Sequence, residues 1–289
     1  MICFSDPLDA ASLTEAIQRR RSTAPEAAAG LGRRVEYHPR IDSTSDRARD
    51  IAASGESEGT VVIADEQTAG RGRSQRHWHS PAGMGVYFSV ILRPEAAPAQ
   101  APIFGLMAAV AVAEALQRIS GLPIRIKWPN DLVVDTDGVR RKLAGILSEA
   151  RTTSDGIRDL VIGVGVNVNH AEGDFPPEIR GKSTSLRLLK AAHFSRAEAA
   201  AEILTRLDAW YTLWNRHGHA PLLAAYTAAA VDLVGRAVRV TGTRPGNGEP
   251  EPVGTTAGLD ADGALRVVPD EGGDVLVVRY GEIVRLEEP

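Results

Sequence analysis

Thr68-Ala-Gly-Arg-Gly-Arg-Ser-Gln-Arg-His-Trp78 brings two glycines, three arginines and a tryptophan into one short segment. Glycine lets the backbone approach a ligand closely, and successive backbone N–H groups in such a loop form a concavity that binds anions. Arginine adds fork-shaped donors for phosphate and carboxylate groups, and the Trp78 indole offers a face on which a base can stack. The segment predicts a loop for a phosphorylated ligand with an aromatic ring, although a solvated surface loop has the same composition.

The rest of the composition is that of an ordinary globular protein. The chain has 289 residues, 43% hydrophobic and 24% charged, which is enough for one or two domains with a sizeable core. Its net charge of −4 excludes a general cationic field for nucleic acid. We therefore expect a small anionic ligand at the arginines and no DNA partner.

Compartment and membrane signals are also readable. Cys3 is the single cysteine, so no disulfide can form within the chain, which indicates a reducing, cytoplasmic compartment. The N-terminal segment carries acidic residues and no apolar h-region, so no signal peptide is expected. The longest apolar stretch, 103–116, is too short to span a bilayer, and no membrane partner is expected.

Hydrophobic periodicity predicts strands interspersed with helices in the first four-fifths of the chain. Ser43 and Ser195 are typical N-caps, and Glu198 would complete a capping box with Ser195. Strands are expected at 35–41, 60–64, 85–93, 124–128, 132–134, 142–149 and 160–168, and helices from 43 to near 55, at 103–119, from 195 to 218 and at 221–230.

The two ends of the chain have a different character. Near the N-terminus, Leu8, Leu13 and Ile17 predict one short, loosely packed helix in a partly disordered extension. From Gly235 onward, short alternating segments separated by turn residues predict a small β-barrel of about 55 residues. The expected division is 1–33, 34–232 and 233–289.

Familiar ligand signatures fail on inspection. Gly181-Lys-Ser-Thr184 resembles the end of a P-loop, but Pro176 stands where the first glycine belongs. The Gly-x-Gly pairs that begin at Gly70 and Gly163 lack the third glycine of a dinucleotide fingerprint. The pairs His77/His79 and His217/His219 have no cysteine or carboxylate companions at metal-ligand spacing, so we predict no protein metal ligands.

Three downstream segments favour a ligand site. In Lys127-Trp-Pro-Asn-Asp131, the proline keeps the preceding residue extended and displays the Asn-Asp pair at a strand end. In Lys142-Leu-Ala-Gly-Ile-Leu147, a lysine begins an apolar strand, which is costly unless an anion meets it. Gly163-Val-Gly-Val-Asn-Val-Asn169 places glycines and asparagines in another apolar strand.

Each feature also has a structural alternative. Lys142 can extend to solvent, Asn167 and Asn169 can satisfy a turn, and Gly145 can serve packing alone. Taken one at a time, these features are more often structural than functional. Their occurrence together in one chain favours a ligand site.

Together these segments resemble those of biotin protein ligase (biotin–[acetyl-CoA-carboxylase] ligase), in the same order along the chain. The resemblance covers residues from about 35 to 289 and implies an α+β catalytic domain built on a mixed sheet, followed by a small SH3-like β-barrel. It rests on Asp42-Ser-Thr44, Gln67-Thr-Ala-Gly-Arg-Gly-Arg73, Lys127-Trp-Pro-Asn-Asp131, Lys142-Leu-Ala-Gly-Ile-Leu147 and Gly163-Val-Gly-Val-Asn167.

The resemblance implies an enzyme that uses ATP to convert biotin to biotinyl-5′-AMP. The biotinyl group then passes to a specific lysine of a biotin carboxyl carrier protein or domain, of acetyl-CoA carboxylase or a related carboxylase. Mg²⁺ would accompany the ATP phosphates. Such enzymes are monomers or homodimers.

The resemblance also assigns roles to residues. Lys142, Arg71 and Asp131 would be catalytic, and Trp78 would pack on the adenine. Biotin would contact Ser43, Thr44, Ser45, Gln67, Arg71, Gly72, Arg73, Lys142, Gly145 and Gly165, and the nucleotide would contact Arg71, Arg73, Trp78, Asn130, Lys142 and Asn167.

The sequence departs from the family pattern at three places. Ser45 stands where asparagine is usual, and Ser74-Gln-Arg76 replaces a further glycine, which would stiffen the loop. Only about 34 residues precede the first core strand, too few for the winged helix-turn-helix of bifunctional members. We therefore expect a monofunctional ligase without the DNA-binding domain.

Rival interpretations are disfavoured by particular residues. A lipoate–protein ligase shares the fold and the acyl-adenylate chemistry, but the Gly-Arg-Gly-Arg loop argues against it. A non-catalytic biotin-binding protein is disfavoured by the intact Lys142, Asp131 and Arg71. The short N-terminal segment argues against a transcriptional regulator.

Overall fold

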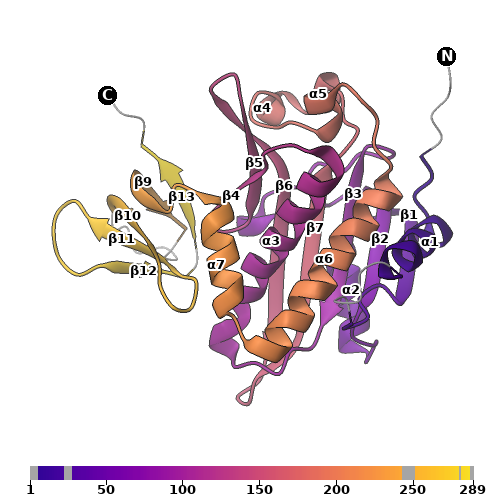
Figure 1. Ribbon diagram of the computed structural model, residues 1–289, viewed down its shortest axis with the longest axis horizontal. Helices are drawn as coiled ribbons and strands as arrows, with labels where there is room; N and C mark the ends of the chain where they lie inside the picture. Colours follow the sequence, from indigo (N-terminus) through magenta and orange to yellow (C-terminus); the bar gives the residue numbers. More distant parts are fainter. Residues whose placement is uncertain (1–5, 23–27, 243–250, 280, 287–289) are drawn as a thin grey trace.

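A mixed eight-stranded sheet is the centre of the molecule (Figure 1). The computed structural model describes residues 6–22, 28–242, 251–279 and 281–286. The strand order is β1-β2-β3-β7-β6-β5-β4-β8, in which β1 pairs parallel with β2 and β4 parallel with β8, whereas the other pairs are antiparallel. The strands are β1 (Arg34–Ile41), β2 (Thr60–Gln67), β3 (Gly85–Leu92), β4 (Arg125–Lys127), β5 (Asp131–Thr136), β6 (Val139–Thr152), β7 (Ile157–Asn167) and β8 (Ala230–Val231).

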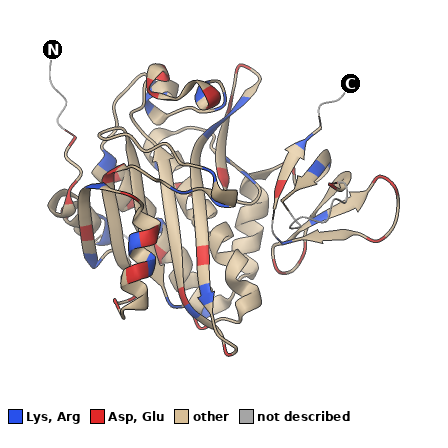
Figure 2. Cartoon of the chain, turned by 180° about the vertical axis from the view of Figure 1, so that it is seen from behind, with Lys and Arg blue, Asp and Glu red and all other residues tan. Residues whose placement is uncertain are grey.

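Two long helices, α3 (Ala101–Ser120) and α6 (Arg196–His217), cover one face of this sheet and form the main core with it (Figure 1). Seen from behind, the opposite face carries α2 (Thr44–Ala53) and loops (Figure 2). That face is therefore free to hold a ligand. The remaining helical segments are α1 (Ala10–Arg21), α4 (Pro177–Arg180), α5 (Leu186–Lys190), α7 (Ala220–Ala229) and the 3-10 turns η1 (Arg73–Gln75), η2 (Pro98–Gln100) and η3 (Glu172–Asp174).

The apolar segment around α3 is longer than expected. Among the described residues, Pro98–Ser120 is the one helical segment long and apolar enough to cross a membrane, so the expectation that it is too short was wrong. However, 67% of its most apolar window is buried inside the protein. This burial is typical of the core helix of a globular fold.

Helix ends follow the predicted capping residues in part. Ser43 Oγ accepts from the backbone N–H of Asp46 at the start of α2, and Ser195 Oγ accepts from that of Glu198 at the start of α6. Gly218, with a φ of 69°, ends α6. The predicted capping box was wrong, because the Glu198 carboxylate instead pairs with Arg19 and Arg20 on α1, each at 2.7 Å.

The expectation of loose packing near the N-terminus was also wrong. Leu13 and Ile17 on α1 are 0% and 2% exposed against the core. Asp208 on α6 accepts the backbone N–H groups of Gly30 and Leu31, both at 2.9 Å. A buried carboxylate satisfied in this way fixes the segment before β1. Cys3 and the disorder predicted for parts of 1–33 lie outside the described residues.

The C-terminal segment forms a small antiparallel sheet, as predicted, but no closed barrel is formed among its described residues. Val238, Val240 and Leu265 from this sheet join the main core. β8 ends at Val231 and β9 begins at Val234, so we retain residue 233 as the proposed domain boundary. In spatial order the strands are β12 (Leu276–Val278), β11 (Leu265–Pro269), β10 (Val253–Leu259), β9 (Val234–Thr241) and β13 (Glu282–Arg285).

Candidate active site

A cross-strand row of residues forms the floor of a cavity on the sheet face opposite α3 and α6. Tyr87 lies opposite Gly165, Gly165 opposite Gly145, Gly145 opposite Asp131, and Asp131 opposite Lys127. Directly opposite residues in an antiparallel pair project to the same face. The two glycines in the middle of the row therefore leave a hollow, and the Asp131 and Lys127 side chains stand along one side of it.

A β-bulge brings Lys142 to the same face. Ala144 pairs with Leu132 and Lys142 with Val133, so β6 contributes one extra residue, Leu143, at this point. In a regular strand without a bulge, residues three positions apart such as Lys142 and Gly145 would project to opposite faces. The bulge at Leu143 brings them to the same face. The Lys142 backbone is held from outside the sheet, since its N–H donates to the Lys182 carbonyl at 2.8 Å and its carbonyl accepts from Thr184 at 2.9 Å.

The cavity has a volume of about 720 Å³, which lies within the range for small-molecule sites. Ser43 is not among its lining residues, because its buried Oγ caps α2. Every other residue of the predicted catalytic, biotin and nucleotide sites lines it: Thr44, Ser45, Gln67, Arg71, Gly72, Arg73, Trp78, Asn130, Asp131, Lys142, Gly145, Gly165 and Asn167.

One end of the cavity is polar and uncharged. The hydroxyl groups of Thr44 and Ser45 lie 2.9 and 3.0 Å from Ser89 Oγ. Gln67 Oε1 accepts from the Thr44 N–H at 2.9 Å, and its Nε2 donates to Ser80 Oγ, also at 2.9 Å. Ser89 on β3 and Ser80 before it, which hold this network together, were not identified from the sequence, because a serine in a strand or loop carries no distinguishing signal.

The Trp78 ring lies on the glycine floor. A Cβ added at Gly165 would come within 2.5 Å of the indole, and one at Gly145 within 3.1 Å, so only glycine leaves room for the ring. The indole Nε1 is buried without a hydrogen-bond partner among the described residues. Lys142 Nζ lies 5.3 Å from the ring centroid, which is a cation–π distance.

The arginine loop before Trp78 is closed by hydrogen bonds of its own backbone and contains strained residues. The Trp78 N–H donates to the Gly70 carbonyl at 2.8 Å, and the Gly72 N–H to the Arg76 carbonyl at 2.7 Å. Ser74 and Gln75 adopt φ angles of 53° and 61°, a left-handed backbone conformation that residues other than glycine rarely adopt. The predicted stiffening by these residues remains a prediction.

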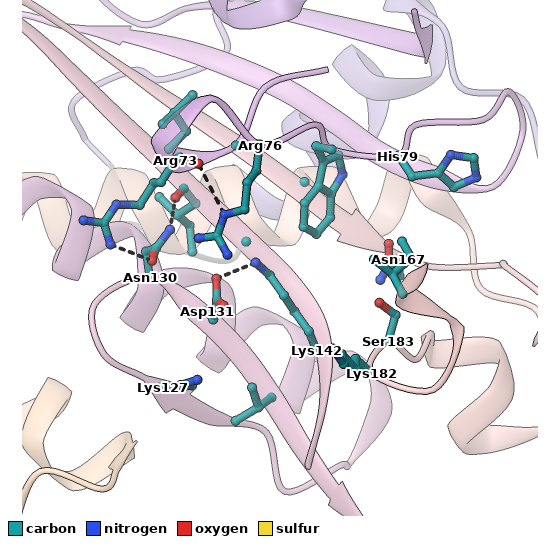
Figure 3. A pocket seen from close by; sticks show the side chains of 18 of the residues that line it. Arg73, Arg76, His79, Lys127, Asn130, Asp131, Lys142, Asn167, Lys182 and Ser183 are labelled. Carbon is teal, nitrogen blue, oxygen red and sulfur yellow. Dashed lines mark hydrogen bonds and ion pairs between the residues drawn. The ribbon is translucent and has the colours of Figure 1, made fainter. Parts of the chain in front are cut away.

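Three cationic side chains of the site, Lys142, Arg73 and Arg71, are held by anionic or amide partners, and Figure 3 shows the first two. Lys142 Nζ lies 2.6 Å from Asp131 Oδ1, and Arg73 donates to Asn130 Oδ1 at 3.2 Å. Burial lowers the pKa of the Arg73 guanidinium below its ordinary value. Arg71 lies 2.6 Å from a carboxylate oxygen on each of Asp46 and Glu149.

The far end of the cavity contains residues that sequence reasoning missed. Lys127, Arg140 and Arg285 line it, the last from β13 of the C-terminal sheet, whereas Lys182 lines the cavity on the other side of Lys142, beside Ser183. Lys127 could have been noticed because it opens the Lys-Trp-Pro-Asn-Asp segment. Arg285 had no sequence signal. Within the described ranges, no cluster of three or more His, Cys, Asp or Glu side chains could hold a metal ion.

Comparison with known proteins gives one consistent family. Residues 37–167 match the biotin/lipoate A/B protein ligase family. The chain is 36% identical over 244 residues to the bifunctional ligase/repressor BirA of Bacillus subtilis, covering 84% of this chain and 71% of that protein. It is 34% identical over 264 residues to the biotin–[acetyl-CoA-carboxylase] ligase of Mycobacterium tuberculosis, covering 89% and 91%.

A solved structure agrees with this result. The biotin protein ligase from Aquifex aeolicus in complex with biotin and ATP superposes with a TM-score of 0.71 at 28% identity. The match covers 89% of this chain and all of that one. The similarity therefore includes both sheets.

Proposed function

The chain belongs to the biotin/lipoate A/B protein ligase family, and we propose that it activates biotin with ATP and transfers the biotinyl group to a carrier-protein lysine. The observation that carries this proposal is the convergence of the Gly-Arg-Gly-Arg loop, Lys142 and the glycine floor on one cavity. The acceptor would be a biotin carboxyl carrier protein or domain, and the reaction would take place in the cytoplasm.

The polar, uncharged end of the cavity suits the ureido ring of biotin. A urea group presents one carbonyl acceptor and two N–H donors, which match the hydroxyl groups of Thr44 and Ser45 and the amide of Gln67. Ser43 would act indirectly, by fixing the start of α2 that carries Thr44 and Ser45. Gly145 and Gly165 would leave room for the apolar chain.

Lys142 would hold the two reacting anions together. A biotin carboxylate oxygen attacks the α-phosphorus of ATP, and the bond from that phosphorus to the bridging oxygen breaks, so pyrophosphate leaves with the electron pair. Both partners are negative, and a compact ammonium between them offsets their repulsion. Lys142 is paired with Asp131, so the incoming anions would replace that carboxylate.

The nucleotide would extend from Lys142 toward the loop. Arg71 and Arg73 supply donors for the α-phosphate, and Asn130 and Asn167 line the adjoining wall. Trp78 would leave the glycine floor to pack on the adenine. Mg²⁺ would bind mainly to the ATP phosphates, with Asp131 as the carboxylate beside them, and would supply charge neutralisation there.

In the second step the acceptor lysine amine attacks the carbonyl carbon of the mixed anhydride, and AMP leaves. The arginine loop would protect the anhydride from water, because its residues line the cavity in which the adenylate would lie. Asp131, once released from Lys142, would accept the amine proton.

The direct test is mass spectrometry of a biotin carboxyl carrier domain after incubation with this protein, biotin and ATP. We expect a mass increase equal to one biotinyl group on a single lysine. ATP–pyrophosphate exchange should depend on biotin and not on lipoate. Exchange with lipoate alone would favour the lipoate-ligase alternative, and no exchange with either would favour a binding protein.

A further inference from the structure

The cavity continues past Lys142 into a cationic end, and we propose that this end, centred on Lys127, binds the β- and γ-phosphates of ATP and the pyrophosphate that leaves. This inference rests on the proposed function and assigns a role to residues outside the predicted site. Arg285 on β13 also lines the cavity. Figure 3 shows Lys127 below Asp131 and Lys142 at the same cavity.

Lys127 is a cation that no described residue neutralises. Its cross-strand partner is Asp131, whose carboxylate already forms an ion pair with Lys142 at 2.6 Å. Asp232 is the other nearby carboxylate, and it forms an ion pair with Arg140. Burial is the main reason that the pKa of the Lys127 ammonium lies below its ordinary value. A partly buried ammonium without an anion is costly, so the site is suited to an anion that arrives with the ligand.

The local charge balance supports the same conclusion. Asp135 and Asp232 both contact Arg140, so that arginine is already neutralised. Lys127 and Arg285 then remain as cavity-lining positive side chains that form no ion pair with a carboxylate in the described part of the chain. This surplus occurs in a chain whose net charge is −4, and it is concentrated at one end of a cavity.

The order of the strands places this end where a leaving group must go. The biotin end involves β2 and β3, Lys142 lies on β6, and Lys127 lies on β4. Neighbouring strands are about 4.8 Å apart, so β4 lies roughly 10 Å beyond β6. In phosphoryl and nucleotidyl transfer the attacking and leaving oxygens are roughly in line. A carboxylate that attacks from the biotin side therefore expels pyrophosphate toward β4.

The experiment separates the two half-reactions in the full-length protein. Lys127→Met should lower kcat/KM for ATP in biotinyl-5′-AMP formation by about 10²-fold, the usual effect of removing one charged donor from a transition state. Transfer from supplied biotinyl-5′-AMP to the carrier domain should stay within about twofold of the unchanged protein, because pyrophosphate takes no part in it. Lys127→Arg should recover most of the adenylation.

Two further variants calibrate the result. Lys142→Met should impair both half-reactions, and Lys190→Met, on the exposed side of α5, should impair neither. Inhibition of adenylation by added pyrophosphate should weaken in Lys127→Met and not in Lys190→Met.

Equal losses in both half-reactions of a folded Lys127→Met variant would overturn the pyrophosphate assignment, as would unchanged adenylation. Circular dichroism establishes folding, and Lys127→Arg provides the test if Lys127→Met does not fold. An unchanged protein that neither forms the adenylate nor transfers from it would instead overturn the proposed function. These two failures are therefore distinguishable.

Discussion

The two ends of the cavity are organised in opposite ways. At the neutral end, proposed for biotin, Thr44, Ser45 and Gln67 are already fixed by hydrogen bonds to one another and to two serines. At the charged end, proposed for the nucleotide, Lys142 and Arg71 are held by carboxylates that the proposed ligand would replace. Neutral polar groups can be pre-organised at low cost, whereas cations kept without partners are costly to bury. The comparison predicts that substitutions at the charged end alter the chemistry and that those at the neutral end alter binding.

The largest expected effect is at Lys142. Lys142→Ala should lower biotinyl-5′-AMP formation by about 10³-fold, because no other ammonium would stand between the two anions. ATP–pyrophosphate exchange measures the loss. The thermal unfolding profile should change little, since Lys142 and Asp131 are both partly exposed. Near-normal ATP–pyrophosphate exchange by Lys142→Ala would contradict the prediction that substitutions at the charged end alter the chemistry.

The next effect concerns the glycine floor. Gly165→Ala would place a Cβ in the space on the floor that we propose for the apolar chain of biotin, and overpacking of this kind costs about 1–3 kcal/mol. Biotin affinity, measured by titration calorimetry, should fall by roughly tenfold or more. Gly173→Ala is the matched control, because a Cβ there meets nothing within 4 Å. Equal affinities for the two variants would mean that the floor does not shape the biotin site.

A smaller effect should come from a carboxylate that competes with the ligand. Glu149→Gln weakens the pair with Arg71, which lies at 2.6 Å. A partly exposed pair of this type is worth about 1 kcal/mol or less, so affinity for biotinyl-5′-AMP should rise, by up to about fivefold. Asp159→Gln is the comparison, since it contacts Arg151 away from the cavity. Weaker adenylate binding in Glu149→Gln would show that the carboxylate assists the site.

The smallest effect should come from the loop backbone. Gln75 has a φ of 61°, and glycine adopts this conformation without the cost of about 1 kcal/mol. Gln75→Gly should speed limited proteolysis of the unliganded loop, because glycine also gains freedom when the loop opens. Saturation with biotin and ATP should restore protection. The same cleavage rate with and without these ligands would argue against loop closure.

Local sequence signals accounted for most secondary structure. Ser43 and Ser195 were predicted as caps and Gly218 as a stop, and the structure confirms all three. The predictions that were wrong concerned residues whose partners lie far away in the sequence. Glu198 forms ion pairs with Arg19 and Arg20 instead of completing the predicted capping box. The N-terminal segment is fixed by Asp208, a residue about 180 positions away. No local pattern reports contacts over such separations.

The candidate site divides in a similar way. Gly145, Gly165 and Lys142 stood out because glycine and lysine are unusual in apolar strands. Arg285 and Ser89 did not, because an arginine in a surface strand and a serine in a core strand are common in proteins of every function. Their positions beside the cavity depend on strand order and on the placement of the C-terminal sheet.

By itself the sequence determined the kinds of residue available: a glycine-rich cationic loop, a lysine in an apolar strand, and caps and turns that delimit each element. Those properties follow from local backbone preference and side-chain chemistry. Only the tertiary structure decided that the bulge at Leu143 turns Lys142 toward Gly145 and Asp131, and that Lys127 shares their face. Pairing register between strands sets which side chains meet, and register is fixed by the packing of the whole sheet.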